Sequence, residues 1–586
     1  MIMKIGLVKL ILLLVAIGAV LSLATGLTAQ TTKRVSVTSG GVESDGESFF
    51  SAVSGDGRYV AFSSWSTNLV PGGTNGWLQV LRADLDDGSI IDASLDYLGQ
   101  QATIYSWFPT ISADGNRVCF TTNSTALVPG PEDYIFQAYA RDVSGEETIL
   151  ASCSVGGNAG NDESYFSAIS GDGNYVAFSS FATNITPDGS TTEHVYVKNL
   201  QTGSINRASV NSDGEPGNGR SSAPYISYDG RYAIFSSDAT NLVDDDTNGV
   251  ADVFVRDMLN ETTERVNVSS TGEQANGGSD WPTISGDGRY AAFECSASNL
   301  VTPNTASGRS NVYVYDRDTG TIQIVSVDSA GNYGNAGSSG AVISLNGKYV
   351  VFNSDATNLV ATPNNGRTQV YTHRMSTGET IMASVNSAGV AGDNYSDWQS
   401  VSGDGRVVAF ASYATNLVSD DTNNERDIYV REIGPPYTVT AMIDCGGPKT
   451  GNWIADAYYK GGKAQYTSKT ISNTGSVPVQ VYQTQRTGRF SYIIPNLESG
   501  AYTINLHFAE TVYSKKGARI FDVVVNGITV LSRFDIYSAA GCKKNTAVVK
   551  SVSAEVAEDA SSLTITFVPI KTDAAICGIE VWKLFE

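Results

Sequence analysis

Short apolar runs alternate with turn residues through residues 48 to 433, and one pattern recurs among them. Its centre is Ser-x-Asp-Gly followed by mostly apolar residues, as in S-G-D-G-R-Y-V-A-F from Ser54. Further copies begin at Ser112, Ser170, Ser227, Ser285, Ser344 and Ser402, the copy from Ser344 having Asn-Gly for Asp-Gly. The turn glycines lie 58, 58, 57, 58, 59 and 58 residues apart. A nearly fixed period of this length indicates tandem structural repeats.

Each repeat contains four strand-like runs. Asp-Gly between the first two supplies the positive φ that a tight hairpin turn needs. A four-stranded unit cannot bury both of its faces alone, so seven repeats predict an all-β, seven-bladed β-propeller. R-V-S-V at residues 34–37 matches a fourth strand without partners, and D-I-Y-V-R-E at residues 427–432 is a third strand without a fourth. We therefore expect the N-terminal strand to complete the seventh blade and close the ring.

The repeats resemble the TolB-type propeller, whose units carry the same Ser-x-Asp-Gly turn and an I-Y-V-x-D strand after it. The resemblance implies a propeller over residues 30–434. It leaves the role open, because such propellers serve as docking platforms, periplasmic scaffolds and enzyme accessory domains. Strand order places the Asp-Gly turns on one face and longer, more varied loops on the other. Loops of that kind on a rigid scaffold commonly carry recognition.

Aromatic residues enter the predicted innermost strands near that loop face. They are Phe49, Phe50, Trp107, Phe108, Tyr165, Phe166, Trp281 and Trp398. Such side chains could form a rim that stacks on a sugar or a peptide, or they could pack between blades. We favour packing between blades, because large aromatic side chains are mostly buried in protein interiors.

Two acidic segments, Asp244–Asn248 and Asp420–Asn424, place carboxylate and amide oxygens close together in equivalent loops. Oxygen ligands of this kind could hold Ca²⁺. Other repeats lack the carboxylates there, and the spacing matches no complete Ca²⁺ loop, so solvated turns are the simpler interpretation. We assign no metal and no cofactor.

The pattern changes after Pro435 and Pro436. Residues 437–586 contain half-buried strand-like runs with Asn-Gly and Ser-Gly turns and no helical period, which predicts a β-sandwich. The segments I-D-C-G-G, W-I-A-D, V-Y-Q-T-Q-R, Y-T-I-N-L-H-F-A-E, R-I-F-D-V-V-V-N-G, F-D-I and C-G-I-E-V follow one another in order. Together they resemble a malectin domain, a carbohydrate-binding jelly-roll sandwich. The resemblance implies that this module recognises a glycan.

The same resemblance assigns the binding residues. Aromatic rings stack on sugar C–H surfaces, and carboxylates and amides bind hydroxyl groups. Tyr458 and Tyr459 occupy the first binding loop, Tyr513 follows F-A-E, and Asp573 precedes the last strand. The sequence departs from the family where Thr487 and Val512 replace aromatic residues. These departures put the disaccharide specificity of the animal lectin in doubt and leave general sugar binding or protein contact possible.

Charge and the N-terminus bear on localisation. The net charge is -22, and an acidic surface of this kind repels nucleic acid and anionic lipid. Lys4 and Lys9 precede or begin a largely apolar run to Ala24, which is typical of a signal peptide over residues 1–29. We expect an exported protein, in the periplasm, at the cell surface or secreted, with no membrane insertion after signal cleavage. A retained N-terminal anchor is the alternative.

Catalytic signals are weak. G-x-S-x-G does not occur, and the histidines His194, His373 and His507 show no metal-ligand spacing. The six cysteines show no disulfide framework, and we assign no pairs. The leading hypothesis is a non-catalytic carbohydrate-binding protein, its partner a glycan or cell-surface polysaccharide. The alternatives are a docking scaffold that binds a protein on the propeller face, and a polysaccharide-active enzyme that uses that face.

Overall fold

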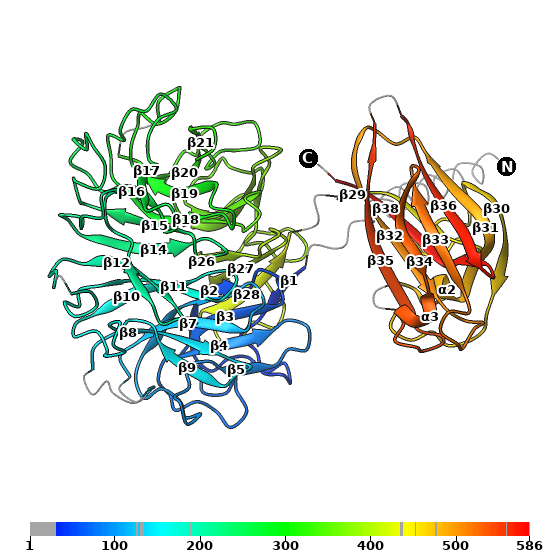
Figure 1. Cartoon of the computed structure of the whole chain (residues 1–586), viewed down its shortest axis with the longest axis horizontal. Coiled ribbons are helices and arrows are strands. Elements are labelled where there is room, and N and C mark those ends of the chain that lie inside the picture. The colour runs from blue at the N-terminus through cyan, green and yellow to red at the C-terminus, as the bar shows by residue number, and fades with distance from the viewer. Residues whose placement is uncertain are drawn as a thin grey trace, which may run out of the picture. The chain divides into compact units, whose positions relative to one another are not determined.

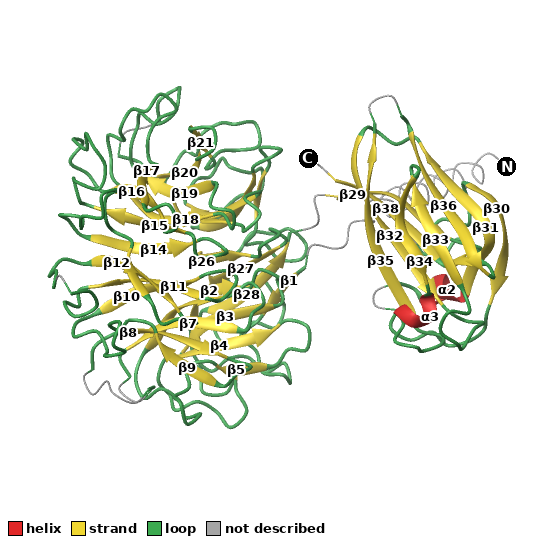
Figure 2. Cartoon of the chain, in the orientation of Figure 1, coloured by secondary structure: helices red, strands yellow, loops and turns green. Residues whose placement is uncertain are grey.

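The computed structural model describes residues 31–584 except 125–126, 129–133, 188, 306–307, 434–436, 452, 475–476 and 558–559. The expected signal peptide and the Pro-Pro pair lie outside the described residues. The chain divides into two compact units, Gln30–Ile433 and a second that contains Gly434–Glu586. Apart from two short helices in the second unit, the regular elements of the described residues are all strands, joined by loops and turns (Figures 1 and 2). The chain is all-β, as the sequence predicts.

The strands of the N-terminal unit form seven four-stranded antiparallel sheets within the described residues. The first three sheets are β2 (Ser48–Val53), β3 (Tyr59–Ser64), β4 (Gln79–Asp84), β5 (Ile90–Asp92); β6 (Ser106–Ile111), β7 (Arg117–Thr122), β8 (Gln137–Asp142), β9 (Glu147–Leu150); and β10 (Ser164–Ile169), β11 (Tyr175–Ser180), β12 (His194–Asn199), β13 (Ile205–Arg207). The next three are β14 (Ser221–Ile226), β15 (Tyr232–Ser237), β16 (Asp252–Asp257), β17 (Thr262–Arg265); β18 (Ser279–Ile284), β19 (Tyr290–Cys295), β20 (Asn311–Asp316), β21 (Thr321–Ile324); and β22 (Ser338–Ile343), β23 (Tyr349–Ser354), β24 (Gln369–Arg374), β25 (Thr380–Met382). The seventh is β26 (Ser396–Val401), β27 (Val407–Ser412), β28 (Asp427–Glu432) and β1 (Thr32–Arg34).

The predicted Asp-Gly turns join the first and second strands of the sheets. In the first sheet, Gly57 has φ +76° and Asp56 accepts hydrogen bonds from Ser54 Oγ at 2.5 Å and from Arg58 N at 3.0 Å. Ser54 Oγ in turn accepts from Tyr59 N at 2.9 Å. The recurring Ser, Asp and Gly of the repeat therefore form the turn itself rather than a ligand site.

Backbone hydrogen bonds link each Asp-Gly turn to the turn of the next sheet. Asp56 N donates to Ala113 O, and the links continue through Gly171, Tyr228, Gly286, Leu345 and Gly403. Gly403 N donates to Gly55 O at 2.9 Å, so the seventh turn is bonded to the first. These turn-to-turn hydrogen bonds form a belt in which the residue after each turn serine takes part. The belt leaves little room at Gly55, because an added Cβ there would lie 2.7 Å from Ala113 Cβ.

Hydrophobic clusters lie between consecutive sheets of the N-terminal unit, and each cluster draws residues from both of its sheets. One further cluster joins Ala409, Ile428 and Val430 of the seventh sheet to Val60 and Phe62 of the first. β1 pairs antiparallel with β28. The first and last repeats are therefore in direct contact, and the N-terminal strand belongs to the last sheet.

The C-terminal unit contains two sheets. One comprises β29 (Tyr437–Asp444), β38 (Gly578–Leu584), β32 (Gly500–Ala509) and β35 (Ala547–Val556). The other comprises β30 (Tyr459–Tyr466), β31 (Thr484–Pro495), β36 (Ser562–Lys571), β33 (Ile520–Val525) and β34 (Ile528–Phe534), with β37 (Ala574–Ile576) beside β31. The helices are α2 (Val479–Gln483) and α3 (Ile536–Ala539). Apolar residues of both sheets form one buried core, as a sandwich requires.

Candidate functional site

Tyr458 and Tyr459 are the first pair of predicted sugar-binding residues; Tyr459 begins β30, and Tyr458 directly precedes it. Each is 47% exposed. The guanidinium of the buried Arg486 stacks on Tyr459, 3.3 Å from the ring centroid. Asp456 holds that guanidinium, with Arg486 Nε at 2.9 Å, and also accepts a hydrogen bond from Tyr492 at 2.7 Å. The Arg486 guanidinium therefore covers one face of the Tyr459 ring and holds it in place.

Tyr513 and Asp573, the second pair, meet at another buried arginine. Arg519 Nη1 lies 3.2 Å from Asp573 Oδ1, and the Arg519 guanidinium lies 5.1 Å from the Tyr513 ring centroid. Arg519 also donates to Glu510 at 2.8 Å. Glu510 accepts hydrogen bonds from the backbone of Val512 and Tyr513, both at 2.9 Å. Glu510 therefore fixes the backbone at Tyr513.

The two pairs are not joined to each other. Within the described residues, no hydrogen bond, ion pair or ring contact links Tyr458 or Tyr459 to Tyr513 or Asp573. Tyr459 belongs to β30 and Asp573 directly precedes β37, and β31 lies between these two strands and pairs with both. Thr487, where the family has an aromatic residue, is buried and donates to Lys463 O at 3.3 Å. It offers no ring to a ligand.

A polar cavity of about 320 Å³ in the same unit contains residues that the sequence interpretation did not select. Tyr466, Gln483, Gln485 and Val512 are among its lining residues. Tyr466 ends the strand that Tyr459 begins. Alternation along β30 was too weak to reveal this position, because every residue of the strand is exposed.

The two acidic loops of the N-terminal unit are occupied by arginines. Arg265 Nη1 lies 3.1 Å from both Asp246 and Asp252. In the loop of the seventh sheet, Arg34 Nη1 lies 3.3 Å from Asp427 and 3.6 Å from Asp421. Each of these loops therefore has a cation of its own. Among the described residues, no group of three or more His, Cys, Asp or Glu has metal-binding geometry.

The third residue of every innermost strand adopts a left-handed backbone conformation. These residues are Phe50, Phe108, Phe166, Ala223, Trp281, Gly340 and Trp398, with φ between +47° and +65°. The pairing register shifts around this position in each sheet, as at a β-bulge. The conformation costs a residue with a Cβ roughly 1–2 kcal/mol. Glycine avoids that cost, yet five of the seven positions hold aromatic residues.

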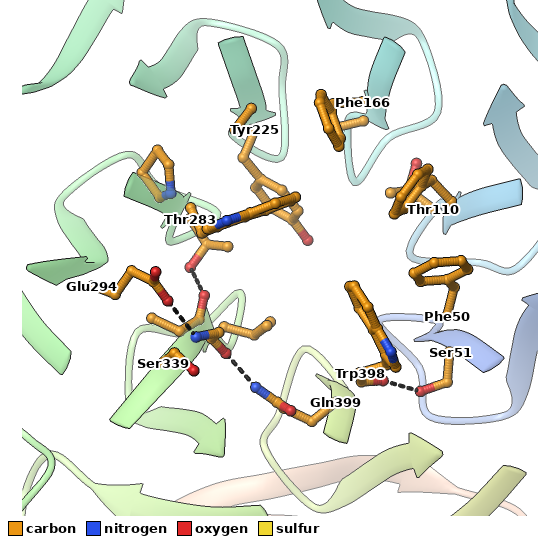
Figure 3. Close-up of a pocket in the computed structure, with 18 of the residues that line it drawn as sticks. Phe50, Ser51, Thr110, Phe166, Tyr225, Thr283, Glu294, Ser339, Trp398 and Gln399 are labelled. Atoms are coloured by element: carbon orange, nitrogen blue, oxygen red, sulfur yellow. Dashed lines mark hydrogen bonds between the residues drawn. The ribbon is translucent and has the colours of Figure 1, made fainter. Parts of the chain in front are cut away.

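The bulge turns these aromatic side chains into a central cavity of about 420 Å³ (Figure 3). Their rings contact one another around it. Phe50 lies 4.3 Å from Trp398 and 4.2 Å from Phe108, and Phe166 lies 5.4 Å from Phe108 and 5.2 Å from Trp281, all between ring centroids. The expectation that these five residues pack between blades is wrong. The same expectation is correct for Phe49, which packs on the hydrophobic cluster between the first and seventh sheets.

The opposite side of the cavity is polar. Glu294 Oε2 accepts a hydrogen bond from Gly340 N at 2.8 Å, and Asn353 Oδ1 accepts one from Ser339 Oγ at 2.8 Å. Gln399 is buried and donates through Nε2 to Gly340 O, while its Oε1 has no hydrogen-bond partner among the described residues. Figure 3 shows Glu294 and Ser339 across the cavity from Phe50. The cavity therefore combines an aromatic wall with hydrogen-bonding groups.

Two further observations concern the cysteines and the hydrophobicity of the helices. All six cysteines are free, and Cys542 is the exposed one. In the part of the chain that the structure describes, no helix is both long enough and apolar enough to span a bilayer.

Comparison with known proteins identifies the C-terminal unit. The malectin domain family model matches residues 439–579, so this unit is a malectin-like domain, as its motifs predict. The Kinesin-like protein KIN-14E of rice is 37% identical over 136 residues, which is 22% of this chain and 12% of that protein. Malectin-B of Xenopus laevis is 41% identical over 63 residues, 10% of this chain and 23% of that protein. The chain spans about a tenth of the length of the curated relatives it matches first.

Comparison with solved structures adds a similarity that covers a larger share of the chain. The structure of a protein described as "putative TolB from Agrobacterium tumefaciens" matches with a TM-score of 0.31 and 19% sequence identity. The match covers 47% of this chain and 79% of that one.

Proposed function

We propose that this protein is an exported, non-catalytic carbohydrate-binding protein whose malectin-like domain recognises a glycan. The observation that carries the proposal is the malectin domain match over residues 439–579. The half-exposed Tyr459 ring stacked on Arg486 supports the proposal, as do Tyr513 and Asp573, which both contact Arg519, because sugar binding uses aromatic faces and carboxylates.

We infer that the seven sheets of the N-terminal unit are the blades of a closed β-propeller, which acts as a scaffold or second binding face. The belt of turn hydrogen bonds from Gly55 to Gly403 and back supports this architecture. So does the pairing of β1 with β28. A chain that begins at Thr38 loses β1, and we expect it to unfold at a lower temperature. An unchanged melting temperature would contradict the inferred closure.

Glycan binding is tested on the full-length protein with an array of α- and β-linked glucans, xylans, mannans and chitin oligosaccharides. Tyr459→Ala removes the supported ring, and we expect at least a tenfold loss of affinity for the glycan that binds. Tyr97→Ala is the control, because Tyr97 lies in the other unit and is similarly exposed, at 52%. Silence across the array, with a stoichiometric protein partner recovered instead, would favour the docking scaffold.

Export is tested separately. N-terminal sequencing of the protein recovered from medium, periplasm and membrane fractions is expected to begin close to residue 30, after the apolar run. Recovery of the uncleaved chain from the membrane fraction would favour the retained anchor.

A further inference from the structure

Two of the aromatic residues that line the central cavity, Trp281 and Trp398, stay partly exposed despite their size. Trp281 and Trp398 are 40% and 39% exposed, and both have a backbone conformation that disfavours any side chain. Ala223 and Gly340 at the equivalent positions of other sheets show that the bulge forms without an aromatic ring. Residues in strained backbone conformations commonly lie at binding sites. The cavity volume of about 420 Å³ lies within the range of small-ligand sites, ~300–1,000 Å³.

The charges around the cavity favour an uncharged ligand. Among the described lining residues, none is a lysine or an arginine, which leaves no counterion for an anionic ligand. The two lining carboxylates are engaged: Glu294 accepts from Gly340 N, and Asp397 is paired with Arg426. Burial also raises the pKa of Glu294, which disfavours its charged form at the cavity wall.

The main-chain groups of the innermost strands favour a carbohydrate over a peptide. Recognition of an extended peptide by a sheet needs a free strand edge. Here Trp398 O already accepts from Ser51 Oγ at 2.7 Å, and Ala341 O accepts from Thr283 Oγ1 at 3.2 Å. Hydroxyl-rich ligands instead need side-chain acceptors and donors opposite an aromatic face, which the polar side of the cavity provides.

A second cavity adjoins the first. It measures about 410 Å³ and shares Ser339, Asn353 and Asp397 with the aromatic cavity. Tyr395, Tyr413 and Arg426 are among its other lining residues, and the shared residues come from the sixth and seventh sheets. An aromatic cavity that continues into this second cavity, the adjoining cleft, can hold a linear ligand whose end lies in the aromatic cavity.

We propose that the aromatic cavity and its adjoining cleft bind the end of an uncharged oligosaccharide chain, with the terminal sugar stacked on Trp281 and Trp398. This assignment specifies the proposed second binding face and does not depend on glycan binding by the malectin-like domain. Asn353, Ser339 and Gln399 provide the hydrogen bonds to hydroxyl groups.

The test uses the full-length protein and calorimetric titration with tetrasaccharides of glucose, xylose, mannose and N-acetylglucosamine. We expect at least one to bind, and Trp281→Gly and Trp398→Gly each to weaken it at least tenfold. Glycine relieves the left-handed strain, so both variants should keep a melting temperature near that of the unaltered protein. Trp77→Ala is the matched control, because Trp77 is 41% exposed and lies outside both cavities.

Tyr459→Ala separates the two sites. Binding that survives Tyr459→Ala and is lost in Trp281→Gly supports the cavity. Binding lost in Tyr459→Ala and kept in both tryptophan variants places the glycan on the malectin-like domain and overturns the cavity proposal. Absence of binding by all four tetrasaccharides also overturns it, as does a peptide or tetramethylammonium ion that binds in a Trp398-dependent manner while the sugars do not.

Discussion

Arg34 is the buried cation that β1 contributes to the seventh sheet, and its replacement by methionine tests how that strand is held. Its side chain is 2% exposed. Nη1 lies 2.6 Å from Glu43, 3.3 Å from Asp427 and 3.6 Å from Asp421. The Asp427 and Asp421 side chains are themselves buried. Arg34→Met therefore leaves two buried carboxylates without their cation.

The expected cost follows from that arrangement. Breaking a buried ion pair by removal of one partner costs about 3–5 kcal/mol. For a unit the size of Gln30–Ile433, unfolding entropy of ~2.1 cal/mol/K per residue gives about 0.8 kcal/mol/K. The melting temperature should then fall by about 4–6 °C. Differential scanning calorimetry of the full-length protein measures this change. Lys33→Met is the control, because Lys33 is exposed and its contact with Glu432 is 3.7 Å long, so about 0.5 kcal/mol or less is expected.

The deficit should also depend on pH. Burial raises the pKa of Asp427, so the folded state binds this proton more readily than the unfolded state. The contribution of such a carboxyl group to stability falls as pH rises through its folded pKa and recovers as pH falls. Loss of the Arg34 charge raises that pKa further, so Arg34→Met should be less damaging at pH 4.5 than at pH 7.5.

A second substitution should repair the first. Glutamine occupies the position equivalent to Asp427 in three other sheets and accepts a hydrogen bond from a serine there; the pairs are Gln79 with Ser94, Gln137 with Ser152 and Gln369 with Ser384. Ser36 is the equivalent serine beside Asp427. Arg34→Met with Asp427→Gln should regain at least half of the lost stability. A loss below about 1 kcal/mol, a loss independent of pH, or no repair would refute the reasoning.

Three further outcomes are expected. Gly115→Ala should cost more than about 2 kcal/mol in thermal unfolding, because φ is +69° and the new Cβ would lie 2.0 Å from Tyr59 Cδ2, whereas Gly88→Ala, at φ +72° with open space, should cost less; equal losses would contradict the clash. Burial lowers the pKa of His373 to about 4, so the unfolded state is protonated first as the pH falls. The free energy of unfolding from denaturant titrations should therefore fall by up to about 3 kcal/mol between pH ~6.5 and 4. His373→Gln should flatten this dependence of stability on pH, and an unchanged dependence would assign it to other groups. EDTA or added Ca²⁺ should leave the melting temperature unchanged, because Arg265 already lies between Asp246 and Asp252; a rise of several degrees with Ca²⁺ would oppose that assignment.

Much of the fold was accessible from local patterns. The Asp-Gly turns form where the repeat places them, since positive φ at Gly57 and a side-chain acceptor at Asp56 are local requirements. The malectin-like domain was identified because its motifs run in order through one unit. The candidate sugar-binding residues remain a prediction from that resemblance. The structure adds how they are supported, through Arg486 beneath Tyr459 and Arg519 between Tyr513 and Asp573.

The sequence alone predicts that the aromatic residues of the cavity pack between blades, whereas the structure places them in the cavity. Their placement depends on strand register and not on the local sequence. Phe50 and Phe49 are both phenylalanine and adjacent, yet one lines the cavity and the other packs between sheets. The difference arises from a register shift between β2 and β3 that places Phe50 at φ +57°. An aromatic residue has no intrinsic preference for that conformation, so no propensity argument selects it.

By itself, the amino-acid sequence determined the repeat number, the hairpin turns and the division into two units, because turn chemistry and alternating polarity act over a few neighbouring residues. The tertiary structure decided which charges and rings meet. Arg34 and Asp427 are separated by 393 positions, and Trp398 and Phe50 come from opposite ends of the repeat array. Such contacts depend on how distant strands register against one another, and that register is set by the packing of whole sheets rather than by any segment alone.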